Sequence, residues 1–223
     1  LFRSVQTLSA WLGHGPFAMW LVKTATPRVI VELGSHTGFS YFAMCQAVQD
    51  NGLQTRCFAV DTWLGDEHSG LYDETIFQSV QAHNCRYEQF STLLRKRFDQ
   101  ALADIPDASI DLLHIDGRHF YDDVKEDFEC WVPKLSNRAI VLFHDTEVVE
   151  RNFGVKKYWH ELRTRYDGFE FEHCHGLGVL FFGTEANEAA VLLRGQIATP
   201  NGLTHLQRVF AELGAAVVEN RAV

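Results

Sequence analysis

Four side chains able to move protons or bind metal ions follow two apolar stretches in the second half of the chain. Asp116 and His119 come after the first stretch, and His144 and Asp145 come after the second. If both stretches are neighbouring parallel strands, they lie about 4.8 Å apart and their carboxyl ends meet at one sheet edge. We therefore predict a catalytic site made of Asp116, His119 and His144.

This cluster fits two kinds of chemistry. Two ionised carboxylates in one cleft repel each other unless a positive charge neutralises them, and oxygen ligands suit magnesium, calcium or manganese. We therefore predict a metal site at Asp116, His144 and Asp145. In a metal-free alternative, His119 or His144 acts as a general base, because an ordinary histidine pKa of about 6.5 suits proton removal from a hydroxyl. A purely structural alternative makes Asp116 a helix cap.

A glycine turn earlier in the chain is the second candidate site. It follows an apolar, β-branched stretch typical of a buried strand, and the missing Cβ atoms of Gly34 and Gly38 let a ligand approach the backbone closely. Thr37 and Ser40 are expected to cap the next helix, whose first N–H groups then point into the turn. The residues predicted to contact a ligand here are Glu32, Gly34, Ser35, Thr37, Gly38 and Ser40.

The next apolar stretch, residues 55–60, ends at Asp61, whose carboxylate can accept hydrogen bonds from both hydroxyls of a ribose. Glycine turn, helix, strand and acidic residue together make the nucleotide-binding half of a doubly wound sheet. The spacing from Gly34 to Gly38 differs from the dinucleotide pattern G-x-G-x-x-G, and this difference disfavours an NAD-linked oxidoreductase.

Three motifs carry a resemblance to a known family. ELGSHTGFS at residues 32–40 resembles the first motif of class I S-adenosylmethionine-dependent methyltransferases, in the ELGxxxGxS form of catechol-type O-methyltransferases. LHIDGRH at 113–119 and VLFHD at 141–145 resemble a bacterial subgroup often encoded beside, or fused to, glycosyltransferases. Many class I enzymes have another glycine where His36 stands, so the turn is expected to differ in shape. The resemblance covers residues 11–183.

The resemblance implies further contacts to S-adenosylmethionine. Thr62 and Trp63 begin the loop after the second strand, where Trp63 either stacks on the adenosine or fills a gap under the loop. Ser91 is predicted to cap a helix over residues 92–103 and to meet the adenine, and Asp116 is predicted to lie beside the cofactor.

The resemblance also bears on the metal and the reaction. Catechol-type enzymes hold a divalent metal ion at positions that match Asp116 and Asp145. His144 departs from their oxygen ligands, which leaves manganese, iron or zinc as alternatives to Mg²⁺. The implied reaction is a direct displacement in which the protein aligns an acceptor oxygen about 3 Å from the methyl carbon.

Apolar periodicity, read together with the resemblance, predicts an α/β fold with a doubly wound, seven-stranded, mostly parallel sheet whose last strand pair is antiparallel. The predicted strands are residues 29–33, 55–60, 87–90, 109–115, 139–143, 169–173 and 178–182. We predict an N-terminal helical cap (1–27) with a turn at His14, a cofactor-binding methyltransferase domain (28–184), and a C-terminal helical tail or connector (185–223).

Composition limits the class of partner. The chain has 223 residues, 46% hydrophobic residues and a net charge of -9, which argues against nucleic acid or an anionic membrane as the main partner. No apolar run approaches the roughly 20 residues that span a bilayer. The five cysteines form no CxxC pair and no zinc spacing, so we expect a reducing compartment and a cytoplasmic location.

These observations predict an S-adenosylmethionine-dependent O-methyltransferase that acts on a hydroxyl of a sugar, a glycan or another small molecule. The expected cofactors are S-adenosylmethionine and Mg²⁺ or another divalent cation. A fused or neighbouring glycosyltransferase domain and a second copy of the chain are expected partners, and because the chain begins without methionine we expect an excised domain. The alternative is a catalytically silent nucleotide-binding or scaffolding domain of a glycan-synthesis protein.

Overall fold

A computed structural model describes residues 9–67 and 70–219 of the chain. The elements follow one another in this order: η1 (Ala10–His14), α1 (Gly15–Ala25), β1 (Val29–Leu33), α2 (Phe39–Asp50), β2 (Arg56–Asp61), β3 (Gly65–Asp66), β4 (Gly70–Leu71), α3 (Glu74–Asn84), β5 (Ser91–Arg95), α4 (Phe98–Ala101), η2 (Leu102–Asp104), β6 (Ile110–Ile115), α5 (Tyr121–Trp131), η3 (Val132–Lys134), β7 (Leu135–His144), α6 (Val155–Leu162), β8 (Asp167–Phe171), β9 (Leu177–Phe181), α7 (Glu188–Ile197) and α8 (Gly202–Glu219).

The seven-stranded sheet is confirmed, with strand order β5-β2-β1-β6-β7-β9-β8. The strands from β5 to β7 pair in parallel, whereas β9 runs antiparallel to both β7 and β8. After β1 the chain moves outward through β2 to β5 and then returns to β6 on the other side of β1. Open α/β sheets bind ligands where the strand order reverses in this way, so the crevice is expected at the carboxyl ends of β1 and β6.

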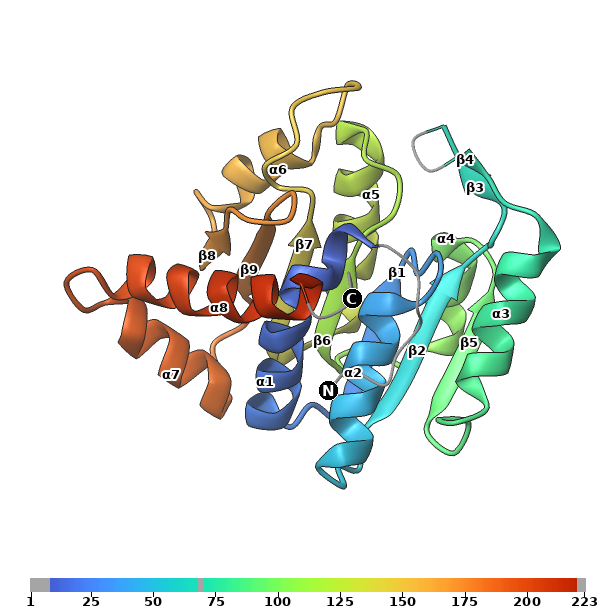
Figure 1. Cartoon of the computed structure of the whole chain (residues 1–223), viewed down its shortest axis with the longest axis horizontal. Coiled ribbons are helices and arrows are strands. Elements are labelled where there is room, and N and C mark those ends of the chain that lie inside the picture. Colours follow the sequence, from blue (N-terminus) through green and yellow to red (C-terminus); the bar gives the residue numbers. More distant parts are fainter. Residues whose placement is uncertain (1–8, 68–69, 220–223) are drawn as a thin grey trace.

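Helices cover both faces of the sheet (Figure 1). One hydrophobic cluster joins α1, α2, α7 and α8 to one face, and a second cluster joins α4, α5 and α6 to the other. All five residues of β1 and all six of β6 are buried, as expected for central strands covered on both sides. Two rigid layers therefore hold the carboxyl ends of these strands in place.

The prediction for the sheet edge is wrong. Residues 87–90 form a turn, closed by a hydrogen bond from Ser91 N to the carbonyl of Tyr87, and the strand is β5, Ser91–Arg95. Helical backbone in the predicted segment begins only at Phe98. β5 is an edge strand with partly exposed leucines, and this short amphipathic pattern does not distinguish a strand from a helix.

The break predicted at His14 is confirmed, because η1 ends there and α1 follows with a proline in its first turn. The part of the predicted cap before Ser9 lies outside the described residues. The predicted C-terminal tail contains two helices, α7 and α8, and they pack on α1 and η1. A Cβ atom on Gly214 of α8 would lie 2.2 Å from the carbonyl oxygen of Gly13, so α8 closes directly on the backbone of η1.

No helix within residues 9–67 and 70–219 combines the length and apolar character needed to cross a bilayer. All five cysteines are free thiols.

Candidate functional site

A cavity of about 610 Å³ opens at the carboxyl ends of the central strands, a size usual for sites of small molecules and cofactors. Among the residues that line it are ten of the predicted site residues: Gly34, Ser35, Thr37, Ser40, Asp61, Thr62, Asp116, His119, His144 and Asp145. Glu32, Gly38, Trp63 and Ser91 do not line it. The structure therefore brings together the glycine turn and the predicted catalytic cluster, which are far apart in sequence.

The glycine turn is shaped mainly by its own backbone. Gly34 has a φ of +84°, and a Cβ atom there would lie 2.1 Å from the carbonyl oxygen of Asp116. The missing side chain thus lets the turn after β1 contact the end of β6, in addition to leaving room for a ligand. Gly38, with φ +85°, is the N-cap of α2, and no side chain caps this helix. The prediction that Thr37 or Ser40 caps it is therefore wrong.

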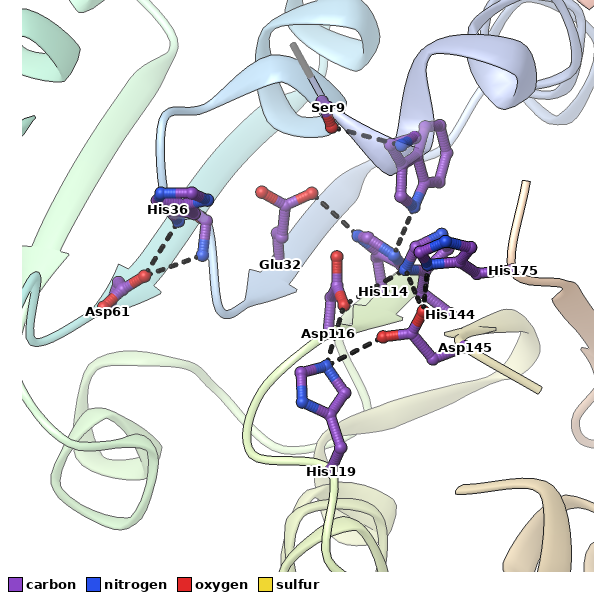
Figure 2. A network of polar contacts seen from close by, with 12 residues as sticks. Ser9, Glu32, His36, Asp61, His114, Asp116, His119, His144, Asp145 and His175 are labelled. Atoms are coloured by element: carbon purple, nitrogen blue, oxygen red, sulfur yellow. Dashed lines mark hydrogen bonds and ion pairs between the residues drawn. The ribbon is translucent and has the colours of Figure 1, made fainter. Parts of the chain in front are cut away.

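Asp61 holds this turn against the end of β2 (Figure 2). The backbone N–H groups of Ser35 and His36 donate to Oδ2 of Asp61 at 2.9 and 3.0 Å, and that of Trp63 donates to Oδ1 at 2.7 Å. A carboxylate oxygen can accept two hydrogen bonds, so Oδ1 retains capacity for a hydroxyl donor. Asp61, which is predicted to bind a ribose, therefore also positions the glycine turn.

Two predicted contact residues have structural roles instead. Trp63 is buried, donates its indole N–H to the carbonyl of His36 at 2.9 Å and packs on Phe77, which agrees with the gap-filling alternative. Ser91 begins β5 opposite Cys57, at the amino end of the strand, where its Oγ lies 2.6 Å from the hydroxyl of Tyr41. Since ligands bind at the carboxyl ends, the prediction that Ser91 meets the adenine is wrong.

The predicted convergence of Asp116, His119, His144 and Asp145 is present (Figure 2). Nδ1 of His144 lies 3.4 Å from Oδ1 of Asp116 and 3.4 Å from Oδ1 of Asp145. Nε2 of His119 lies 2.9 Å from Oδ2 of Asp145. One ligand atom each from Asp116, His144 and Asp145 lie within 4.8 Å of one another, so two carboxylate oxygens and one imidazole nitrogen fit a divalent cation.

A backbone carbonyl on the side away from the carboxylates sets the orientation of the His144 ring. Its Nε2 lies 3.2 Å from the carbonyl oxygen of Cys174, and a carbonyl can only accept, so Nε2 carries hydrogen and Nδ1 faces the two carboxylates. Metal-ligating histidines are commonly held in this way by a carbonyl on the far nitrogen. The ring of His119 is held by Phe153, which stacks on it at a centroid distance of 4.4 Å.

His175 completes the cluster and was not among the predicted site residues. Its Nδ1 lies 3.2 Å from Oδ1 of Asp145, and it also lines the cavity. It stands in a tight turn in which Cys174, His175 and Gly176 all have positive φ values. Because the start of β9 pairs with the end of β7, this turn lies at the catalytic edge of the sheet. The predicted antiparallel pair of last strands was the sequence signal from which this position could have been found.

Charge coupling within the cluster shifts the pKa values. Burial would lower the pKa of His144, but Asp116 and Asp145 raise it to about 10. Burial likewise opposes protonation of His119, whose hydrogen bonds to the same two carboxylates raise its pKa to about 9. Burial would raise the pKa values of Asp116 and Asp145, yet the histidines hold both below the ordinary range. Without a metal ion, protons on His119 and His144 therefore neutralise the carboxylates at neutral pH.

Glu32 lies one layer deeper than predicted. It is fully buried, and its Oε2 lies 2.8 Å from Nδ1 of His114, whose Nε2 lies 3.1 Å from the indole nitrogen of Trp11. Trp11 lines the cavity. Oε1 of Glu32 is buried with no hydrogen-bond partner within the described part of the chain. Trp11 and His114 therefore connect the cavity wall to the first motif.

Comparison with known proteins identifies related sequences. The family model described as a methyltransferase domain matches residues 31–146. Uncharacterized protein y4gI of Sinorhizobium fredii is 56% identical over 212 residues, which are 95% of this chain and 23% of that protein. The chain thus spans about a quarter of the length of this relative.

Solved structures of methyltransferases share the fold. PaMTH1 of Podospora anserina, bound to S-adenosylhomocysteine, has a TM-score of 0.60 at 13% identity, over 80% of this chain and 81% of that one. TomG of Streptomyces achromogenes, an O-methyltransferase in complex with S-adenosylmethionine, has a TM-score of 0.57 at 16% identity, over 80% and 82%. At such identities the likeness is one of fold.

Proposed function

The chain belongs to the methyltransferase domain family and is an S-adenosylmethionine-dependent methyltransferase, and on this premise we propose that it methylates a hydroxyl oxygen of a sugar, a glycan or another small molecule. One observation carries the proposal: a single cavity is lined by the glycine turn at one end and by Asp116, His144 and Asp145 at the other. The O-methyltransferase TomG, which has the same fold, supports the choice of oxygen as the methyl acceptor.

The donor fits the half of the cavity that contains the glycine turn. Asp61 and Thr62 would contact its nucleoside, while the amino-acid end would lie over Gly34 and Ser35, near Glu32. When bound, the cofactor supplies a methyl carbon on a positively charged sulfur. The acidic side chains around the cavity favour a cationic donor, and the adjoining cluster at Asp116 lies where an acceptor can approach that carbon.

Asp116, His144 and Asp145 would hold a divalent cation, with Mg²⁺ and Mn²⁺ as the first candidates because two of the three ligands are carboxylates. Such an ion would neutralise the carboxylates and make an acceptor hydroxyl more acidic. The carbonyl of Cys174 supports this assignment, because it turns Nδ1 of His144 toward the other two ligands.

His119 is the residue proposed to hold the proton removed from the acceptor. Its Nε2 faces the cavity end of Asp145, and Phe153 restricts the rotation of its ring. A pKa of about 9 means that, when no metal ion neutralises Asp116 and Asp145, His119 is already protonated at neutral pH. A general-base role therefore requires that another charge first neutralises Asp116 and Asp145, which favours the metal-assisted version over the metal-free one.

We also propose that the domain works within or beside a longer glycan-assembly protein in the cytoplasm, and that it can pair with a second copy. The greater length of the Sinorhizobium fredii relative supports the first part. The five free thiols support a reducing compartment.

Titration of the purified chain with S-adenosylhomocysteine, NAD and Mn²⁺, followed by transfer of radiolabelled methyl from S-adenosylmethionine to catechol, monosaccharide and nucleotide-sugar acceptors, tests the proposal. We expect binding of S-adenosylhomocysteine and Mn²⁺, no binding of NAD, and label on at least one hydroxyl compound. Cofactor binding without transfer to any acceptor class favours the silent scaffolding domain. Binding of NAD in place of S-adenosylhomocysteine contradicts the proposal.

A further inference from the structure

A buried chain of hydrogen bonds joins the N-terminal segment to the first motif (Figure 2). It runs from the indole of Trp11 through the imidazole of His114 to the carboxylate of Glu32, with separations of 3.1 and 2.8 Å. Trp11 is 2% exposed, and the other two side chains are completely buried. Water therefore does not compete for these hydrogen bonds, and each partner determines the geometry of the next.

The chemistry of the three groups determines which of them donates each hydrogen bond and which accepts it. An indole nitrogen only donates, so Nε2 of His114 must accept from Trp11. His114 then carries its hydrogen on Nδ1 and donates it to Oε2 of Glu32. The indole of Trp11 thus fixes the tautomer of His114, and that tautomer fixes the rotation of the Glu32 carboxylate.

The second oxygen of this carboxylate lacks a donor. Oε1 of Glu32 is buried without a hydrogen bond from any residue that the structure describes. Leaving a buried carboxylate oxygen unpaired is unfavourable, so such an atom marks a place for a donor other than the described residues. Glu32 is two residues before Gly34 of the cavity wall, and Trp11 is itself part of that wall.

We infer that Trp11 and His114 are positioning residues that aim Oε1 of Glu32 at the α-ammonium group of the methyl donor, directly or through one water molecule. The N-terminal segment then selects ligands that carry a cationic amino-acid end over nucleosides that lack it. This inference rests on the proposed function, because it assigns the amino-acid end of the donor to the glycine-turn half of the cavity.

The surroundings of Trp11 support a positioning role. Its backbone N–H donates to Oγ of Ser9 at 3.1 Å, and α8 packs on η1, in which Trp11 lies. The contact between Gly214 and Gly13 allows this close approach. The η1 segment itself, through Ser9, and α8 therefore hold Trp11 at the position from which its indole reaches His114.

Calorimetric titration with two ligands tests the inference. S-adenosylhomocysteine carries the amino-acid end, and 5′-methylthioadenosine has the same nucleoside and sulfur without it. We expect W11F and H114L to lower the affinity for S-adenosylhomocysteine about tenfold, as for loss of a hydrogen bond to a charged group. The affinity for 5′-methylthioadenosine should change less than about twofold. H114N, whose amide can still donate to Glu32, should recover part of the loss. W20F, at a partly buried tryptophan of α1 that does not line the cavity, should leave both affinities unchanged.

If W11F and H114L lower the affinities for both ligands equally, Trp11 has a packing role and the inference is overturned. Unchanged affinity for S-adenosylhomocysteine would overturn it as well. If W11F lowers the melting temperature so far that binding cannot be measured, the comparison of H114N with H114L decides, because both keep the indole. If the wild-type chain binds 5′-methylthioadenosine as tightly as S-adenosylhomocysteine, the inference is rejected but the proposed function stands. If it binds neither ligand, the proposed function is rejected.

Discussion

The two ends of the cavity are built in different ways. At the glycine turn, the contacts are backbone N–H groups on Asp61 and a glycine whose missing Cβ lets two backbone segments touch. At the end of β6 and β7, the contacts join side chains of opposite charge, including His144, Asp116 and Asp145. The first end depends on shape, and the second depends on charge.

This difference separates binding from chemistry. A substitution that adds volume at the glycine turn should prevent cofactor binding, because the backbone there has no room to shift. A substitution that removes charge at the other end should leave the cavity open but change which ions and protons it holds. Substitutions at Gly34, Asp145, Gly214 and Asp127 test this separation, in decreasing order of expected effect.

The largest effect is expected at Gly34. In G34V the side chain would meet the carbonyl of Asp116, at a φ value that valine does not adopt, so affinity for S-adenosylhomocysteine should fall more than about 100-fold. Calorimetry measures the affinity, and circular dichroism checks that the chain is folded. G195A, on α7 with open space around the added Cβ atom, is the matched control. Tight binding by folded G34V would remove the turn from the cofactor site.

The opposite behaviour is expected at Asp145. D145N keeps the shape but removes one charged ligand, so affinity for Mn²⁺, measured by electron paramagnetic resonance, should fall at least about tenfold. Affinity for S-adenosylhomocysteine should change less than about twofold, since Asp145 lies outside the glycine turn. D107N, an exposed carboxylate paired with Lys134, is the control. Loss of cofactor affinity together with Mn²⁺ affinity would contradict the division between the two ends.

Gly214 tests whether the C-terminal helix supports the cavity. G214L places a side chain against the backbone of Gly13, and overpacking of this kind costs about 1–3 kcal/mol of unfolding free energy. Displacement of η1 should also move Trp11 and so lower the affinity for S-adenosylhomocysteine several-fold. A215L, one position along on the exposed face of α8, should change neither quantity. Urea unfolding and calorimetry measure both. Wild-type values for G214L would show that α8 is a separate tail.

The smallest effect is expected at Asp127, a charge in the cavity wall outside the cluster. Burial, and then repulsion from Asp123 and Glu126, raise its pKa to about 8. Because the folded-state pKa is raised, the stabilising contribution of the protonated carboxyl is complete below about pH 4 and is lost as the pH rises through about 8. D127N should therefore equal the wild type at pH 4 and be more stable by about 1 kcal/mol or more at pH 8. A difference independent of pH would contradict this pKa.

Residues that follow central strands could be predicted from sequence. Asp61, Asp116 and His144 each end a buried apolar stretch, and parallel strands place such ends at one edge. The local apolar pattern and one rule of sheet topology were therefore sufficient to predict the positions of the glycine turn and of the candidate metal ligands. The prediction failed for Ser91, because the start of an edge strand depends on pairing with β2 rather than on its own residues.

The supporting residues could not be predicted in this way. Trp11 and His114 are 103 positions apart, and His114 stands in an apolar stretch where sequence alone indicates only burial. His175 reaches Asp145 because a tight turn with positive φ values joins β8 to β9. Such contacts depend on how η1, β6 and the β8–β9 turn are packed, which no local pattern contains.

Proton relaxation of the S-adenosylmethionine methyl group in the presence of Mn²⁺ shows whether the donor and the metal ion share the cavity, because the paramagnetic effect falls steeply with distance. If the donor lies across the glycine turn with its methyl group facing Asp116, His144 and Asp145, Mn²⁺ bound to the wild-type chain will broaden the methyl signal strongly, and D145N will restore a narrow signal. A methyl signal that stays narrow while both Mn²⁺ and the donor are bound would contradict the claim that one cavity holds them side by side.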